Sequence, residues 1–214
     1  AEFQVNTTAP EGPSDPDIAT LGNGGFVVTW TVGQINGSGG IYAQRYDADG
    51  APADGEFRVH TTSEANHQIM SAIAALTDGG YVVTWHSSGQ DGSGDGIYAQ
   101  RYDANGAVVW GETRINTTTD GNQQSPAIAT LADGGYVVTW RSFHQDGSAD
   151  NYAQRYDANG VAVGVETRIN TTTAGDQIFP AITALADGGY VVTGDSYFQD
   201  GSSWGIYAQH YDAD

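Results

Sequence analysis

The stretch Ala132-Asp-Gly-Gly-Tyr-Val-Val-Thr-Trp140 decides the fold, because its central motif recurs along the chain. Val-Val-Thr-Trp stands at 27–30, 82–85 and 137–140, and a fourth copy at 191–194 ends in glycine instead of tryptophan. A Tyr-Ala-Gln motif follows each copy at intervals of 56, 54 and 55 residues, with its tyrosines at Tyr42, Tyr98, Tyr152 and Tyr207. A repeat of this length is a supersecondary unit that buries its apolar face only against its neighbours.

Each repeat predicts four short antiparallel strands. In the copy at 125–172 the expected strands are 126–131, 136–140, 152–156 and 161–170. They are rich in β-branched and aromatic residues, and Asp-Gly-Gly or Asp-Ala-Asn-Gly turns join the first pair and the last pair. No helical period appears. Four strands in about 55 residues is the size of a β-propeller blade, whereas a β-solenoid uses much shorter rungs.

The two ends of the chain predict how the blades are arranged. Residues 2–8 match the fourth strand of a repeat, whereas the chain ends at 207–214 in a third strand and its turn. We therefore expect an all-β, four-bladed propeller over a single domain, 1–214, in which residues 1–8 close the ring. The expected blade units are 9–62, 63–118, 119–172 and 173–214. A piece of a longer array, with blades shared between chains in a homo-oligomer, is the alternative to a monomeric ring.

Composition restricts the partners. The chain has 26 acidic residues against 7 basic ones, and its formal net charge is -19. A field this negative argues against nucleic acid and anionic membranes as partners. We find neither a membrane-length apolar run nor a signal-peptide pattern, so we expect a mature protein or an excised piece of a longer one. Cysteine is absent, and the acidity suits a salty extracellular setting.

Residues that recur in every copy are expected to be structural. The repeated tryptophans and tyrosines should pack sheet on sheet. Arg45, Arg101 and Arg155 should stack on rings or pair with a turn aspartate, and Glu112 and Glu166 recur with the fourth strand. No nucleophile motif or metal-binding histidine spacing supports catalysis, although the spacing of glycosidase carboxylates along a chain is not diagnostic.

Function is expected on the face that carries the longer and more varied loops, around the central channel. These loops join the second strand to the third and one repeat to the next. Aromatic side chains that break the repeat occur there beside amides and carboxylates, a combination that suits sugars. The candidate ligand-binding residues are His86, Phe143, His144, Phe179, Tyr197, Phe198 and Trp204. Neutral variation on a tolerant surface is the alternative.

Two of these loops also carry oxygen side chains at alternate positions. Calcium takes about six to eight oxygen ligands, and a glycine-bearing loop can turn alternate ones inward. The spacing resembles the start of an EF-hand loop but lacks its last glutamate. A polar turn stabilised by its own aspartate is the alternative. The candidate calcium ligands are Asp91, Ser93 and Asp95, and Asp146, Ser148 and Asp150.

The full repeat, with Gly-Gly-Tyr-Val-Val-Thr-Trp, Gln-Asp-Gly-Ser-Gly and Ile-Tyr-Ala-Gln-Arg-Tyr-Asp-Ala-Asn-Gly, resembles tandem repeats of very large secreted bacterial proteins. Those are RTX, hemolysin-type calcium-binding or adhesin-like proteins, and the resemblance covers essentially the whole chain. It implies a secreted or cell-surface location in a bacterium and an adhesion context rich in calcium. It implies no catalytic residue, and the tandem calcium-binding nonapeptides of that group are absent here.

The sequence therefore predicts a non-enzymatic extracellular module that binds a carbohydrate or a cell-surface partner, with assistance from calcium. A purely structural or self-assembling repeat is one alternative. A polysaccharide-active glycosidase or lyase that uses carboxylates of the loop face is the other.

Overall fold

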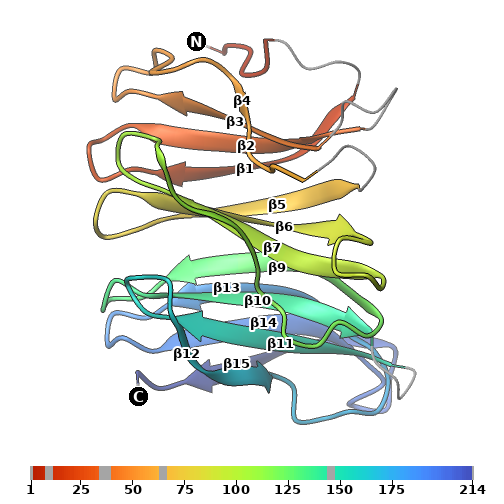
Figure 1. Cartoon of the computed structure of the whole chain (residues 1–214). Coiled ribbons are helices and arrows are strands. Elements are labelled where there is room, and N and C mark those ends of the chain that lie inside the picture. Colours follow the sequence, from red (N-terminus) through yellow and green to blue (C-terminus); the bar gives the residue numbers. More distant parts are fainter. Residues whose placement is uncertain (1, 8–11, 34–39, 63–66, 144–147, 214) are drawn as a thin grey trace.

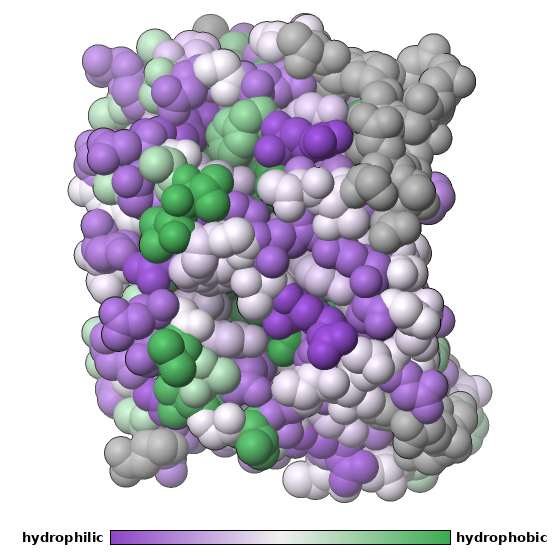
Figure 2. Space-filling view, in the orientation of Figure 1, coloured by the Kyte–Doolittle hydropathy of each residue, from purple (hydrophilic) through white to green (hydrophobic). Residues whose placement is uncertain are grey.

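A computed structural model describes residues 2–7, 12–33, 40–62, 67–143 and 148–213. Within these ranges the regular structure consists of β-strands, which form four antiparallel sheets that follow one another along the chain (Figure 1). The all-β, four-bladed propeller expected from the repeat is confirmed. None of the residues described belongs to a helix that could cross a membrane. The face in Figure 2 is mainly hydrophilic, as the acidic composition requires, with apolar side chains in small separate groups.

In every sheet the strands lie side by side in chain order. The first sheet contains β1 (Pro13–Thr20), β2 (Phe26–Val32), β3 (Gly40–Tyr46) and β4 (Phe57–Arg58). The second contains β5 (Gln68–Ala75), β6 (Tyr81–Ser88), β7 (Asp95–Tyr102) and β8 (Val108–Arg114). The third contains β9 (Asn122–Thr130), β10 (Tyr136–Phe143), β11 (Ala149–Tyr156) and β12 (Ala162–Arg168). The fourth contains β13 (Gln177–Ala184), β14 (Tyr190–Tyr197) and β15 (Trp204–Tyr211).

The prediction that residues 1–8 close the ring as the fourth strand of the last blade is wrong. In the described part of the chain the fourth sheet has three strands, and residues 2–7 lie on the first blade instead. The Tyr46 hydroxyl donates to the carbonyl oxygen of Val5 at 3.4 Å. Tyr102 makes the same contact with Val59 of the preceding blade, at 3.3 Å. The N-terminal segment thus does resemble a fourth strand, but it makes the contacts of a strand that precedes the first blade. The two chain ends lie at opposite ends of the molecule (Figure 1).

Recurrent polar residues fasten each blade to the preceding one. The Glu112 carboxylate accepts hydrogen bonds from the Thr61 backbone N–H at 2.7 Å and from the Thr62 hydroxyl at 2.6 Å. Arg101 pairs with Asp78, a turn residue of its own blade, at 2.6 Å and donates to the Ala158 carbonyl oxygen of the next blade at 2.8 Å. The Glu112 contact recurs in the pairs Glu56–Thr7 and Glu166–Thr117, and Arg155 repeats the Arg101 pairing with Asp133. Arg45 pairs instead with Asp54, in the turn that leads to β4. The structural role predicted for these residues is therefore confirmed.

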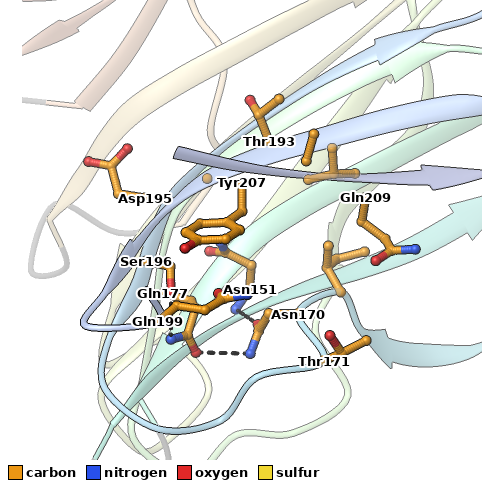
Figure 3. Close-up of a pocket in the computed structure, with 14 residues that line it drawn as sticks. Asn151, Asn170, Thr171, Gln177, Thr193, Asp195, Ser196, Gln199, Tyr207 and Gln209 are labelled. Carbon is orange, nitrogen blue, oxygen red and sulfur yellow. Dashed lines mark hydrogen bonds between the residues drawn. The ribbon is translucent and has the colours of Figure 1, made fainter. Parts of the chain in front are cut away.

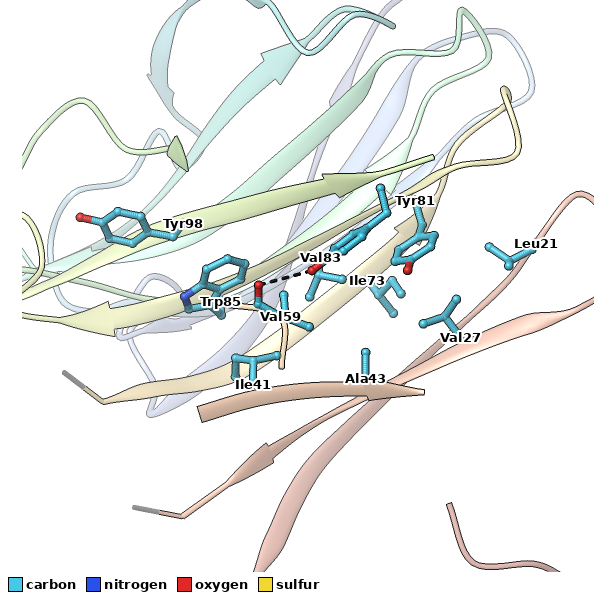
Figure 4. Packing of buried hydrophobic residues seen from close by; sticks show 11 residues of the cluster. Leu21, Val27, Ile41, Ala43, Val59, Ile73, Tyr81, Val83, Trp85 and Tyr98 are labelled. Atoms are coloured by element: carbon cyan, nitrogen blue, oxygen red, sulfur yellow. Dashed lines mark hydrogen bonds between the residues drawn. The ribbon is translucent and has the colours of Figure 1, made fainter. Parts of the chain in front are cut away.

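The hydrophobic core lies between the blades. Figure 4 shows Trp85 of β6 in one cluster with Ile41 and Val59 of the first blade. Trp140 occupies the equivalent place between the second and third blades. The buried cluster that joins the third and fourth blades contains no tryptophan, because Gly194 stands at that position. Burial of one such ring stabilises a blade contact by roughly 2–3 kcal/mol by area, so the last contact is the weakest of the three.

Candidate functional site

The inner strands β1, β5, β9 and β13 each carry a β-bulge at the same place, and the four bulges surround one hollow. The pairing with the second strand shifts at 15–16, 70–71, 125–126 and 179–180. The hollow has a volume of about 340 Å³. Its lining residues are Asp15, Pro16, Asp17, Met70, Ser71, Ser125, Pro126, Phe179 and Pro180. It lies near the start of the inner strands, on the loop face that the sequence predicts to be functional.

The first residue of every bulge has a left-handed backbone, although none of the four is glycine. The φ angle is 50° at Asp15, 55° at Met70, 53° at Ser125 and 52° at Phe179. Such a conformation costs on the order of 1 kcal/mol per residue and is concentrated at functional sites in proteins. The repeated backbone therefore presents a carboxylate, a thioether, a hydroxyl and a phenyl ring at one hollow.

A polar network adjoins this hollow on the second and third blades. The Arg141 guanidinium lies 5.5 Å from the ring centre of Phe179 and 5.0 Å from that of Phe143. Arg141 donates to the side-chain oxygen of Gln124, and the amide of Gln124 donates to the Asp95 carboxylate. A cation held between two rings and a tethered carboxylate has a fixed orientation, which is what substrate positioning requires.

His86 is buried beside this network and is 3% exposed. Burial lowers the pKa of His86 to about 4, although the carboxylates of Asp95 and Asp15 each raise it and only Arg141 lowers it further. The imidazole is therefore neutral at neutral pH. Its Nδ1 has no hydrogen-bond partner among the residues that the structure describes. Two carboxylates from different blades thus act on one buried imidazole.

The structure separates the predicted ligand-binding residues into two groups. His86, Phe143 and Phe179 gather around Arg141, as described above. Their neighbour in the sequence, His144, lies outside the described residues.

The second group is an exposed aromatic cluster on the fourth blade, formed by Tyr197, Phe198 and Trp204. The ring of Tyr197 lies 4.7 Å from that of Phe198 and 5.0 Å from that of Trp204, centre to centre. All three residues are between 38% and 55% exposed. The rings are inclined to one another, at 71° and 51°, and exposed rings of this kind can receive the C–H face of a sugar.

Asp91 and Asp95, two candidate calcium ligands of the second blade, make hydrogen bonds with different partners. Asp91 accepts the backbone N–H of Ser93 at 3.0 Å, as in a polar turn. Asp95 accepts hydrogen bonds from Ser88 and Gln124. The other Asp91 oxygen, Oδ2, is buried without a hydrogen-bond partner among the described residues, so the oxygens of Asp91 and Asp95 do not share a partner.

In the third blade, Asp150 is buried in β11 and accepts a hydrogen bond from Asn170 at 2.6 Å. Ser148 donates to the carbonyl oxygen of Thr173 at 3.5 Å. Asp146 lies outside the described residues. Within the described ranges, no three acidic, histidine or cysteine side chains are grouped to hold a metal ion. Calcium binding stays a prediction.

Sequence reasoning found Phe179 but missed the other three bulge residues and Arg141, although a signal was present. At the first bulge position the four repeats carry Asp15, Met70, Ser125 and Phe179. At the position that follows Val-Val-Thr-Trp they carry Thr31, His86, Arg141 and Asp195. These two positions vary in chemistry between otherwise similar strands. A comparison of the repeats position by position, within strands as well as loops, would have identified them.

No family model matches the chain, and no curated protein sequence matches it. The chain is, however, similar in structure to solved enzymes that act on glycans. A Hadza microbial sialidase aligns with a TM-score of 0.67 and 11% identity over 94% of this chain and 46% of its own. An α-L-arabinanase from Penicillium chrysogenum has a TM-score of 0.62 and 13% identity, over 94% and 57%. An endo-arabinase from Bacteroides thetaiotaomicron has a TM-score of 0.58 and 13% identity, over 91% and 73%.

These likenesses establish the propeller fold. The chain spans about half of the sialidase and 57% to 73% of the two arabinan-degrading enzymes. They also correct the prediction of a non-enzymatic binding module, because the three structures named above are a sialidase and two arabinan-degrading enzymes.

Proposed function

We propose that the chain is a polysaccharide-active enzyme of the glycosidase type, with its reaction centre at the central hollow. The observation that carries this proposal is the convergence of four left-handed, non-glycine residues on one hollow that holds the Asp15 carboxylate and the Phe179 ring. Fold alone assigns no activity, so the argument depends on these side chains.

Glycoside cleavage generally requires two carboxyl groups on either side of the scissile bond. Asp15 lines the hollow, and Asp95 accepts a hydrogen bond from Gln124, which in turn holds Arg141 beside the Phe179 ring of the same hollow. Asp17 is less suited, because one of its oxygens accepts the backbone N–H of Ile73 at 2.9 Å and thereby joins two blades. We assign Asp15 and Asp95 as the reacting carboxylates.

The remaining groups of the site suit the binding of a sugar. Phe179 is 54% exposed at the hollow and presents a ring to the C–H face of a pyranose or furanose. Arg141 stacks on that ring and reaches Asp95 through Gln124, so the platform and one carboxylate are held together. This arrangement positions a glycan relative to the carboxylates.

Hydrolysis of a polysaccharide panel tests the proposal. Arabinan, xylan and sialylated glycans are the first substrates, because sialidase, arabinanase and xylanase are named among the structural neighbours. We expect release of reducing sugar, and we expect Asp15→Asn and Asp95→Asn each to lower kcat about 100-fold or more. Asp200→Asn, at an exposed turn, is the matched control and should retain full activity. Turnover that survives Asp15→Asn, or none on any substrate, would overturn the assignment.

The cellular setting is part of the proposal. The acidic, cysteine-free composition and the resemblance to repeats of secreted bacterial proteins support an extracellular or cell-surface location, where polysaccharides are met. Calcium assistance through the loops that hold Asp91 and Asp150 is proposed on the loop pattern alone.

A further inference from the structure

Two repeat-breaking residues face each other between the third and fourth blades. Gly194 of β14 stands where the other blades carry tryptophan. Asn151 of β11 stands where Ile41 and Ile97 pack against those tryptophans. A Cβ atom on residue 194 would lie 2.5 Å from the Asn151 Nδ2 atom. The two changes therefore belong together, and they replace an apolar contact with a cavity of about 90 Å³ (Figure 3).

The cavity is lined by side chains that hydrogen-bond. Its polar lining includes Asn151, Asn170, Gln177, Ser196, Gln199 and Tyr207 (Figure 3). Some of these are already fixed. Asn170 donates to the side-chain oxygen of Gln177 at 2.9 Å, and Gln177 donates to the Ser196 hydroxyl at 3.3 Å.

Asn151 is the exception. The residue is 4% exposed, and its Oδ1 atom is buried without a hydrogen-bond partner among the described residues. A buried acceptor left unpaired is destabilising, because it has lost its hydrogen bonds to water. The cost is recovered when a donor enters the cavity, and a volume of about 90 Å³ exceeds severalfold the roughly 10–15 Å³ that one water needs.

We propose that this cavity is a binding subsite for a neutral sugar unit, separate from the central hollow. The geometry calls for a compact molecule rich in hydroxyl groups, and the choice of a sugar among such molecules rests on the proposed function. The only ionisable groups in the lining are the Asp195 carboxylate and the Tyr207 phenol, with no cationic side chain in that set, so an anionic sugar is disfavoured. The ring of Tyr207 supplies an apolar wall.

The position of the subsite fits a glycan chain. Gln199 lines the cavity, and in the sequence it stands next to Tyr197 and Phe198 of the exposed aromatic cluster, which Trp204 completes. A sugar held in the cavity could therefore continue as a chain across those rings. The fourth blade thus offers a sugar-binding cavity at the position that tryptophan occupies in the other three blades.

Titration of the side-chain amides by two-dimensional NMR tests the subsite. L-arabinose and D-xylose are the neutral probes, and N-acetylneuraminic acid is the anionic one. With the wild-type chain we expect saturable shifts of the Asn170 and Gln177 side-chain amides on addition of a neutral sugar. The double variant Asn151→Ile with Gly194→Trp recreates the pair that Ile41 and Trp85 form between the first two blades. It should weaken sugar binding about tenfold or more. Asn151→Leu removes the acceptor and should also weaken it.

The outcomes separate this proposal from the catalytic one. Asp15→Asn should lose turnover and keep the sugar-dependent shifts, whereas the double variant should lose the shifts and keep turnover on short substrates. Absence of saturable shifts in the wild type, or shifts that persist in a folded double variant, would overturn the subsite. Equal response to the anionic probe would overturn its assignment to neutral sugars.

Discussion

The cavity beside Gly194 makes a quantitative prediction about stability. Asn151→Ile with Gly194→Trp rebuilds the contact that Ile41 and Trp85 make in the cluster between the first two blades. Filling a cavity contributes about 24 cal/mol per Å³, so about 90 Å³ corresponds to roughly 2 kcal/mol. Removal of the buried, unpaired Asn151 oxygen adds about 1 kcal/mol or more. We therefore expect the free energy of unfolding to rise by about 3 kcal/mol.

The close packing around residue 194 limits this gain and sets the behaviour of the two single variants. A Cβ atom on residue 194 would also lie 3.2 Å from the carbonyl oxygen of Ile178, so β13 must shift by a few tenths of an ångström. The single variant Gly194→Trp keeps Asn151, whose amide nitrogen would be only 2.5 Å from that Cβ atom, and should therefore destabilise the chain. Asn151→Ile alone should raise the free energy of unfolding by only about 1 kcal/mol, because it removes the unpaired oxygen but leaves the cavity largely unfilled.

Thermal and urea unfolding of the four chains in a double-mutant cycle provides the assay. For a domain of this size, about 3 kcal/mol corresponds to a rise in Tm of roughly 6–12 °C. The coupling between the two substitutions should be at least about 2 kcal/mol, because each needs the other to pack. A double variant no more stable than the wild type, or one whose two effects simply add, would refute the view that the pair forms a vacant tryptophan site.

Three further predictions concern the blade contacts, the buried imidazole and the calcium loops. Glu112→Gln should lower stability by about 1.5–3 kcal/mol in urea unfolding, because it weakens bonds from both Thr61 and Thr62. Burial raises the pKa of Glu112, but these bonds outweigh it and hold the pKa below its usual range, so the contribution is lost in acid. His86, with a pKa of about 4 against about 6.5 in the unfolded chain, should cost up to about 3 kcal/mol as pH falls through that interval. His86→Gln should flatten this slope. Asp91→Ala with Asp146→Ala should lower Tm in calcium buffer only, and an equal loss in EDTA would contradict a metal site.

The sequence predicts the blades well because the repeat itself carries the information. Alternating β-branched residues, Asp-Gly-Gly turns and recurrent rings all indicate the same four-strand unit, and β10 and β11 occupy the expected segments. Placement of residues 2–7 could not be predicted. A segment with the sequence of a fourth strand can complete the last sheet or precede the first blade, and local pattern is the same in both cases. In the described part of the chain the fourth sheet ends at β15 and residues 2–7 do not pair with it, an outcome that depends on tertiary packing.

The site was predictable only in part, for a related reason. Phe143 and Phe179 break the repeat visibly, so sequence comparison finds them. Asp15 and Ser125 lie in strands whose pattern looks ordinary, and only the left-handed backbone at the bulge turns them to the hollow. That conformation arises from the pairing of β1 and β9 with their neighbours, and the residues themselves do not favour it.

A scaffold of near-identical blades also explains how the proposed activity can reside in so few positions. Since the four bulges share one backbone geometry, a side chain at that position is presented to the hollow whatever its chemistry, and the scaffold bears the strain. Replacement of Trp by Gly at position 194 applies the same logic to the core: one contact is given up, and a cavity with polar walls results. Both sites therefore arise where one repeat departs from the others at a position that the fold holds fixed. The residues that differ between blades, and not those that recur, are therefore the ones to which we assign the proposed reaction centre and the proposed sugar subsite.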